Sequence, residues 1–348
     1  MGTKIEWTDV VWNPLAGCTW ASTGCDHCYA AVMARRLEFM AQADLTAGRD
    51  PGCKRKYIGI THKNKAGRIM FNGRVNLDPE AIDEPLRWRK PRRVFVNSMS
   101  DLFHKDVPYA FIRKVWLNML ATPQHTYQVL TKRPERMAEV VAQLVEEGWQ
   151  QALPKAFNIW LGTSVENQEQ ADARIPWLLK TPAHVRFLSC EPLLGAVDLS
   201  AWMVASGQYE KAEWMLAKYG SSQPLDWVIV GGESGPGARP MHPDWARSLR
   251  DQCQAGGVSY FFKQWGEFVP ANGDARNSQG IRYCGGDDPN GRDLIGLPDG
   301  TITDIEWNGG PGPHLTGGVQ LLRLGKHAAG RLLDSREWNE FPGMEVAK

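Results

Sequence analysis

Short hydrophobic runs rich in β-branched and aromatic residues recur through the middle of the chain and predict strands. They cover residues 94–97, 127–130, 158–162, 185–189, 227–230 and 259–262. Helix-like stretches lie between several of them, at residues 109–120, 136–147, 167–179 and 243–255. This alternation is typical of a parallel sheet covered by helices. With an N-terminal element it predicts six or seven βα units, and therefore an α/β fold forming an open or partial barrel.

Each predicted strand is followed at once by small, polar or charged residues. The segments SMSDLFH, TKRPE, TSVEN, CEPLL, GGESGPG and KQWG occupy these places. In parallel α/β folds the active site forms at the carboxyl ends of the strands. The alternative for each segment is an ordinary turn with a helix cap. Six successive polar strand ends favour one shared site.

Two segments depart from the alternating pattern. Residues 49–74 hold eight Lys or Arg against one Asp, which predicts a basic insertion at about residues 45–76. Residues 266–313 are rich in Gly, Asp, Asn and Pro and predict an irregular segment, followed by a last helix near 325–333. We therefore expect a barrel over residues 1–268 and an irregular extension over 269–348 that ends in a short helix packed on the barrel.

Composition narrows the class of protein. Hydrophobic residues make up 43% of the 348 residues, enough for a sizeable core, and the net charge is +1, so a nucleic-acid function has to rest on local patches. The N-terminal residues form no apolar run of signal-peptide or transmembrane length, which predicts a cytoplasmic protein without a membrane partner.

Three of the seven cysteines form a cluster. Cys18, Cys25 and Cys28 are spaced Cys-x6-Cys-x2-Cys, just before a helix-like stretch at residues 29–41. Thiolates bind soft metals, and a short loop lets three sulfurs converge. One interpretation is a 4Fe–4S cluster whose fourth iron stays open for S-adenosylmethionine. The alternatives are structural zinc, with His27 or a distant cysteine as fourth ligand, and chance proximity of buried thiols.

Longer motifs point to a family. TKIEWTDVVWNPLAGC, STGCDHCYA, SMSDLFHKDVP, QVLTKRPER, WLGTSVENQ, RFLSCEPLL, DWVIVGGESGPGARPM, FFKQWG and KHAAGRLLDSREWNEFP stand in order along residues 3–342. The chain thereby resembles a phage and prophage family of radical-SAM-like proteins. The resemblance implies a partial barrel of the radical SAM type and a three-cysteine cluster. The usual radical SAM motif has a shorter first gap and an aromatic residue where His27 stands.

The strand ends supply the other candidate residues. Groups expected to bind S-adenosylmethionine are Ser98, Ser100, Asp101, Lys132, Ser164, Glu166, Asn167 and Glu233. Cys190 and Glu191 are the catalytic candidates, with Cys190 as a possible hydrogen-atom donor to a substrate radical. Arg133, Lys263, Gln264 and Trp265 are candidates for contact with the substrate.

Two basic clusters bear on the substrate. One covers residues 54–56, and the other is RWRKPRR at residues 87–93. Basic side chains bind phosphates and an aromatic can stack on a base, whereas the simpler interpretation is a solvated surface. We expect a radical SAM enzyme acting on a nucleotide or nucleic acid, with an electron donor such as flavodoxin or ferredoxin. The alternatives are a peptide or metabolite substrate, or a zinc-stabilised nucleic-acid-binding protein without catalysis.

Overall fold

The structure is a computed structural model that describes residues 3–147, 157–205, 207–219, 224–270, 293–296, 302–305 and 319–343. Contacts divide the chain into two compact units. Unit 1 comprises Met1–Ser164 and Asp172–Phe187, and unit 2 comprises Val165–Ala171 and Leu188–Lys348. None of the helices described is long and apolar enough to cross a membrane.

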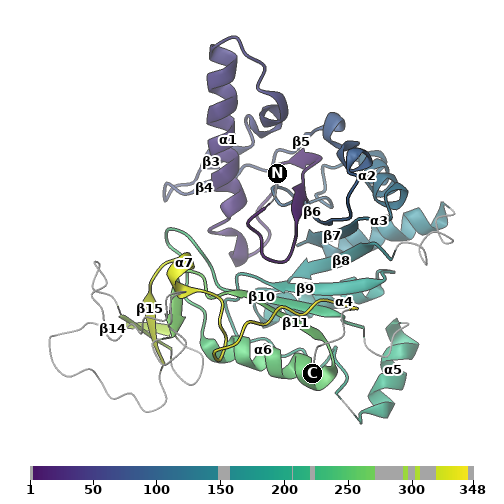
Figure 1. Ribbon diagram of the computed structural model, residues 1–348, viewed down its shortest axis with the longest axis vertical. Coiled ribbons are helices and arrows are strands. Elements are labelled where there is room, and N and C mark those ends of the chain that lie inside the picture. The colour runs from purple at the N-terminus through teal and green to yellow at the C-terminus, as the bar shows by residue number, and fades with distance from the viewer. Residues whose placement is uncertain are drawn as a thin grey trace. The chain divides into compact units, whose positions relative to one another are not determined.

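Unit 1 is built on parallel strands. β1 (Val10–Trp12), β6 (Arg93–Val96), β7 (Thr126–Thr131) and β8 (Ile159–Ser164) pair in this order, each parallel to the next. Parallel neighbours need a crossover, which the helices α2 (Tyr109–Ala121) and α3 (Pro134–Glu146) provide between β6, β7 and β8. Figure 1 shows α2 and α3 beside these strands. Trp12, Val94 and Val129 are wholly buried, as expected for strands of a parallel sheet.

The basic segment of unit 1 is folded against a long helix. Helix α1 (Tyr29–Thr46) contacts the 3-10 helix η2 (Gly52–Tyr57) and the hairpin of β3 (Thr61–Lys63) and β4 (Ile69–Phe71). A short antiparallel pair joins β2 (Leu15–Ala16) to β5 (Asn76–Leu77). The remaining 3-10 helices are η1 (Thr23–Cys25), η3 (Pro79–Ala81) and η4 (Glu84–Arg87). The predicted insertion therefore contains regular structure, and α1 continues past the predicted end at residue 41.

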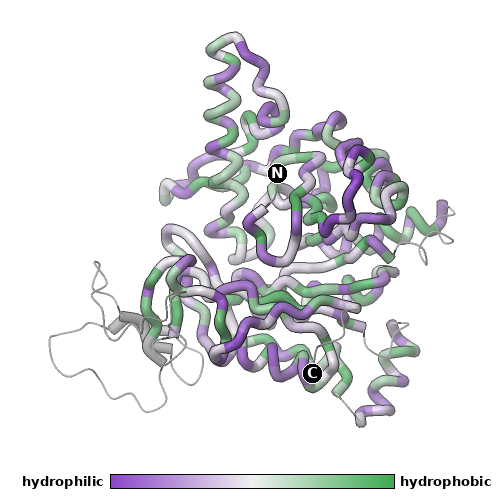
Figure 2. The backbone as a smooth tube through the Cα atoms, in the orientation of Figure 1, coloured by the Kyte–Doolittle hydropathy of each residue, from purple (hydrophilic) through white to green (hydrophobic). Residues whose placement is uncertain are grey.

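Unit 2 continues the same chain pattern. It holds the end of β9 (Val185–Cys190), and β10 (Trp227–Gly231) pairs parallel with β11 (Ser259–Gln264). Helix α6 (Pro243–Gly256) contacts both β10 and β11. Figure 2 shows hydrophobic stretches along these strands, and Trp227, Ile229 and Phe262 are wholly buried. Helix α5 (Tyr209–Tyr219), between β9 and β10, is an element that the sequence pattern did not predict.

In the C-terminal part of unit 2, the residues that the structure describes include a second sheet. The strands β12 (Phe268–Pro270), β13 (Asp293–Gly296), β14 (Ile302–Ile305) and β15 (Val319–Arg323) form an antiparallel sheet in the order β12-β15-β13-β14. The last helix, α7 (Lys326–Ala329), is shorter than predicted and contacts β12. Three of these strands lie within residues 266–313, where we expected irregular structure; most of that range, residues 271–292, 297–301 and 306–313, lies outside the described residues.

The central architecture agrees with the sequence pattern. All six predicted strands are present as β6 to β11, and the four predicted helices are α2, α3, α4 (Gln168–Lys180) and α6. With β1 these strands form a seven-stranded sheet in the order β1-β6-β7-β8-β9-β10-β11. The fold is therefore mixed α/β with strands added in chain order, which is consistent with the predicted partial barrel.

Candidate functional site

The three clustered cysteines lie on the loop that leads from β2 into α1. Cys18 follows β2, Cys25 ends η1 and Cys28 is the residue before α1; all three are free, partly buried thiols. Gly17, just before the first cysteine, has φ +102°, and a β-carbon there would lie 2.1 Å from the carbonyl oxygen of Arg74. Only glycine fits this close approach, so the start of the cysteine loop is held against the end of the basic segment.

Burial and neighbouring charges determine the protonation of these thiols. Burial raises the pKa of Cys18 to about 12; Asp101, Cys25 and Cys28 raise it further, and Arg133 opposes them. Burial also raises the pKa of Cys28, against the amide N–H groups of the first turn of α1 and the charge of Lys132. A bound metal would displace these protons, because thiolate is the ligand form.

Asp101 joins the polar ends of β6 and β7. Its Oδ1 accepts hydrogen bonds from Thr131 Oγ1 at 2.7 Å and from the Phe103 amide at 3.0 Å. Its Oδ2 accepts from an Arg133 guanidinium nitrogen at 2.7 Å and from the Lys132 amide at 3.2 Å. Both carboxylate oxygens are therefore occupied, and the carboxylate fixes the direction of Arg133.

Arg133 links Asp101 to the loop that carries the cysteines. The guanidinium nitrogen that contacts Asp101 also lies 3.6 Å from Cys18 Sγ, and the other nitrogen donates to the Thr19 carbonyl at 2.8 Å. His104 Nε2 lies 2.6 Å from Thr19 Oγ1, and its Nδ1 accepts from the Asp106 amide at 3.2 Å. Burial lowers the pKa of His104. The neutral ring therefore carries its proton on Nε2 and donates to Thr19.

The two predicted serines brace the chain ahead of the cysteines. Ser98 Oγ donates to Asn13 Oδ1 at 3.2 Å, and Ser100 Oγ donates to the Leu15 carbonyl at 3.1 Å. Tyr29, the first residue of α1, donates to the Ser98 carbonyl at 2.9 Å. The end of β6, the segment before Cys18 and the start of α1 thus form one hydrogen-bonded group in unit 1.

The predicted residues after β8 are buried or act as caps. Ser164 is the last residue of β8, and its carbonyl accepts from Arg174 at 2.9 Å. In unit 2, Glu166 is wholly buried, and its main-chain carbonyl accepts from the Leu194 amide at 2.7 Å. Asn167 accepts from the Gln170 amide at 3.0 Å, which is the helix-capping alternative considered for this segment.

Unit 2 brings the end of β9 to the end of β11. The Lys263 ammonium hydrogen-bonds Glu191, and a β-carbon at Gly231 would lie 3.5 Å from both of these side chains. Cys190 is wholly buried, and burial raises the pKa of its thiol, with the charge of Glu166 acting in the same direction. A buried, protonated thiol of this kind is unreactive as a nucleophile; the proposed hydrogen-atom donation stays a prediction.

The other predicted residues of unit 2 have partners within that unit. Arg239 donates to Glu233 through two nitrogens, at 2.7 Å and 3.0 Å. Gln264 donates to Ser234 Oγ at 3.1 Å, and the Trp265 indole donates to the Leu332 carbonyl at 2.8 Å. The candidates Glu233, Gln264 and Trp265 are all buried, so in this structure they serve the packing of unit 2.

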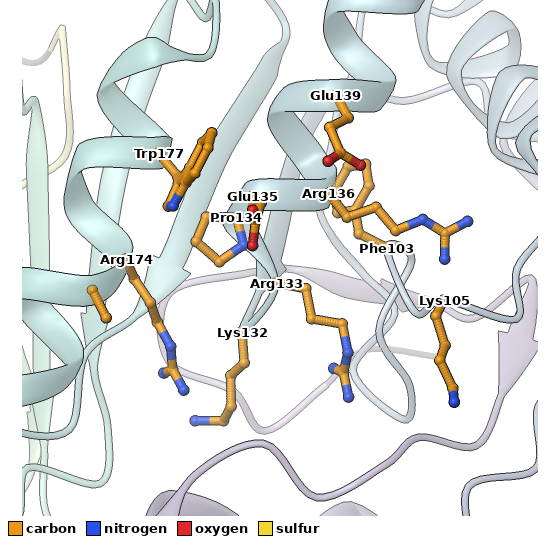
Figure 3. A pocket seen from close by; sticks show the side chains of 11 residues that line it. Phe103, Lys105, Lys132, Arg133, Pro134, Glu135, Arg136, Glu139, Arg174 and Trp177 are labelled. Carbon is orange, nitrogen blue, oxygen red and sulfur yellow. The ribbon is translucent and has the colours of Figure 1, made fainter.

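An open cavity of about 370 Å³ in unit 1 adjoins this arrangement through Arg133. Its basic lining comes from the loop after β6, the turn into α3, and α4. The residues are Lys105, Lys132, Arg133, Arg136 and Arg174, with Trp177 as an aromatic wall. In Figure 3 the charged ends of Arg174, Lys132, Arg133 and Lys105 lie in a row, while Glu139 lies at the other end of the cavity.

Of the two basic clusters identified in the sequence, one lies at the other edge of the sheet, and the cations of the other are paired with acidic side chains. Residues 87–93 lead into the amino end of β6, the opposite edge of the sheet from the residues that follow β6. In the other cluster, each cation pairs with an acid: Lys54 with Asp44, Arg55 with Asp50 and Lys56 with Asp78. Neither cluster adds to the candidate site of unit 1.

Comparison with known proteins places the chain in one family. The family described as "Protein of unknown function (DUF5131)" matches residues 2–342. The chain belongs to this family. No curated protein and no solved structure shows a significant match to this chain. Within the described ranges, no three His, Cys, Asp or Glu side chains are grouped closely enough to be recognised as a site for a metal ion.

Sequence reasoning missed several residues that this family member uses to build the site. Thr19 lies inside the cysteine loop, and His104 and Thr131 lie in or beside segments already singled out as strand ends. A polar side chain at a strand end or in the cysteine loop is a candidate residue of the site, so the sequence did contain a signal for all three. Arg136 and Arg174 belong to helices, and their approach to the cavity depends on packing that no local pattern encodes.

Proposed function

We propose that this chain is a radical S-adenosylmethionine enzyme whose 4Fe–4S cluster is held by Cys18, Cys25 and Cys28. The observation that carries the proposal is the position of three free thiols on one loop, which the contact of Arg133 with Cys18 and Asp101 joins to the polar ends of β6 and β7. When bound, the cluster would supply the electron that cleaves S-adenosylmethionine. Three protein ligands would leave one iron open for that molecule.

The donor set fits such a cluster. Thiolate sulfurs are the usual protein ligands of iron–sulfur clusters, and the partial burial of these three restricts water. The Arg133 guanidinium at Cys18 and the first turn of α1 at Cys28 place positive charge or N–H dipoles beside sulfur. Hydrogen bonds to the sulfurs are one of the means by which a protein tunes a cluster's potential.

The chain's own residues would orient S-adenosylmethionine and hold the loop that carries the cluster. Lys132, at the turn into α3, supplies a cation for the carboxylate of S-adenosylmethionine, and the carbonyls and hydroxyls around Ser98 and Ser100 supply polar contacts for its amino group. The paired Asp101 and Arg133 hold the cysteine loop in place. We propose a nucleotide or nucleic acid as substrate and a flavodoxin or ferredoxin as electron donor.

The test is anaerobic reconstitution with iron and sulfide. We expect broad visible charge-transfer absorbance, and release of 5′-deoxyadenosine after dithionite and S-adenosylmethionine are added. Both signals should be lost when Cys18, Cys25 or Cys28 becomes Ala. They should survive Cys53→Ala, which removes an exposed thiol outside the cluster.

The same experiment decides against the proposal in one case. If the protein takes up zinc but no iron–sulfur cluster, and no 5′-deoxyadenosine appears, the chain is a zinc-stabilised protein and its function lies in binding.

A further inference from the structure

Helix α1 is covered by the rest of unit 1 along one side. On that side Ala30 and Ala34 pack against Tyr57 and Ile60, which belong to the segment that follows the helix. Figure 1 shows the β3–β4 hairpin of this segment beside α1. An α-helix repeats every 3.6 residues, so positions three, four and seven residues apart share a face. The residues that lie opposite to Ala30 and Ala34 therefore form a second face of the helix.

This second face carries large apolar side chains that are exposed. Val32 and Met33 lie one turn before Arg36, and Phe39 and Met40 lie one turn after it, so all five share one side of α1. The four apolar side chains are 43% to 61% exposed. Exposed apolar residues scattered singly are ordinary, whereas a group of them on one helix face is typical of a surface that another molecule covers. We call these five residues the outer face of α1.

The outer face lies in a strongly basic part of unit 1. Residues 29–76 hold ten Lys or Arg against three Asp or Glu. Each of these acids is paired inside the segment: Glu38 with Arg35, Asp44 with Arg49 and Lys54, and Asp50 with Arg55. Arg36 and three hairpin residues, Lys63, Lys65 and Arg68, are exposed and pair with no acid in the part of the chain that the structure describes. Cations of this kind beside an apolar patch favour a partner with an acidic surface.

The outer face also begins beside the cysteine loop. The amide of Val32 donates to the carbonyl of Cys28 at 3.4 Å, so a single helical turn joins the two residues. Tyr29, the first residue of α1, is exposed as well. A protein that docks on the outer face would therefore lie next to the loop that carries the cysteines. Transfer of an electron between two proteins needs such a close approach.

We propose that the outer face of α1 is the docking surface for an acidic one-electron carrier protein. This inference rests on the proposed cluster, to which the reduced carrier gives up one electron; no bond forms or breaks between the two proteins. Arg36 pairs with a carboxylate of the carrier, and the apolar side chains around it exclude water from the contact. Two copies of this basic face would repel each other, and aliphatic side chains such as Val32 offer nucleic acid neither stacking nor charge.

The experiment has two readouts on the full chain. Calorimetric titration with purified flavodoxin, and separately with purified ferredoxin, measures docking and needs no cluster. Release of 5′-deoxyadenosine by the reconstituted protein is then compared with reduced carrier and with dithionite, a small reductant that needs no docking surface.

The test variants are Phe39→Ser and Arg36→Glu. Their matched controls are Leu86→Ser, at a residue of η4 that is 50% exposed, and Arg89→Glu, at an exposed cation that precedes β6.

We expect the parent to bind at least one of the two carriers, and each test variant to bind it at least about tenfold more weakly. The loss in Arg36→Glu should be larger at about 50 mM than at about 500 mM salt, because salt screens the charge pair. Release of 5′-deoxyadenosine should fall to the same degree with the carrier and stay at the parent's level with dithionite. Both control variants should behave as the parent does in every measurement.

The two proposals fail on different results. If the parent releases no 5′-deoxyadenosine even with dithionite, the proposed function is wrong. If the parent binds neither carrier, if both test variants bind as the parent does, or if the controls are weakened equally, the docking surface is wrong. Sedimentation of the parent as a dimer that Phe39→Ser dissociates would instead assign the outer face to a second copy. Binding to phosphatidylserine vesicles that the same change abolishes would assign it to a lipid surface.

Discussion

Asp101 shows how one side chain organises the candidate site. It is 5% exposed and accepts from Thr131, Phe103, Lys132 and Arg133. We first expected it to bind S-adenosylmethionine, a role that the structure leaves as a prediction. The observed bonds give it a positioning role, because without them Arg133 would no longer be directed at the cysteine loop.

Asp101→Asn tests this role. The change keeps the shape of the side chain but removes the counter-charge of Arg133, whose side chain is only 19% exposed. Breaking a pair at this depth should lower the free energy of unfolding by about 3 kcal/mol, as measured by urea denaturation. The control Asp50→Asn, in an exposed pair with Arg55, should leave the midpoint unchanged. Equal effects of the two changes would contradict the positioning role.

Gly17→Ala tests the close approach before Cys18. The control is Gly48→Ala, where φ is also positive at +69° but a β-carbon meets nothing within 4 Å. The control should cost about 1 kcal/mol from backbone strain alone. Gly17→Ala should cost at least about 2 kcal/mol more, because its neighbour is a main-chain oxygen, and should reduce iron retention. Equal losses would mean that the contact with Arg74 does not restrain the loop.

At the scale of elements, the C-terminal segment protects an edge of the sheet. Strand β11 comes last in the sheet order, and an uncovered edge strand invites aggregation. Residues of the final segment cover it: the Phe262 amide donates to the Trp338 carbonyl at 3.0 Å, and the Glu340 amide donates to the Tyr260 carbonyl at 3.2 Å. The family's match through residue 342 includes this segment.

Asp334 anchors the segment to α6 and makes its docking sensitive to acid. Arg247 donates to it at 2.8 Å, and Arg250 pairs with its other oxygen. Burial acts to raise the pKa of Asp334, but the hydrogen bonds from Arg250 and Arg247 outweigh burial and hold the pKa below its usual range. A lowered pKa stabilises the fold above about pH 4. That contribution is lost as the pH falls through the lowered value.

We therefore expect Asp334→Asn to unfold at a lower temperature than the parent at pH 7 and to speed hydrogen exchange at residues 338–340. The difference in melting temperature should shrink as the pH falls from about 4 through the lowered pKa of Asp334, below which the parent's carboxylate is neutral as well. A difference that persists undiminished in acid would show that shape, and not charge, makes Asp334 important.

Elements and contacts differed in how far the sequence predicted them. The strands followed from short apolar runs with polar ends, because burial of a parallel sheet on both faces requires such runs. Helix α5, whose Tyr209, Trp214 and Leu216 are exposed, has no clean apolar stripe for such reasoning to use. Likewise, Cys18 and the turn into α3 were each identified, but their connection through Arg133 depends on side-chain packing over 115 residues of chain.

At the scale of the whole molecule, a net charge of +1 conceals strongly uneven local charge. The sequence drew attention to the densest basic runs, at residues 54–56 and 87–93. In the structure the first run is paired and the second leads into the amino end of β6. The cations of the cavity come from three segments: the loop after β6, residues 132–136 and helix α4. Density along the chain therefore does not identify the cations that line the cavity, and binding of nucleic acid by the two runs stays a prediction.

The whole molecule should also respond to filling of the cysteine site. A ligand that binds the folded chain alone raises its stability, by about 2.7 kcal/mol at a hundred times its dissociation constant. Cluster loading should therefore raise the melting temperature by several degrees, as measured by calorimetry without oxygen. Cys53→Ala should show the same rise, because its thiol is exposed and outside the loop, whereas Cys25→Ala should show none. A rise in all three proteins would mean that iron stabilises the chain elsewhere, and the assignment of the three cysteines would fall with it.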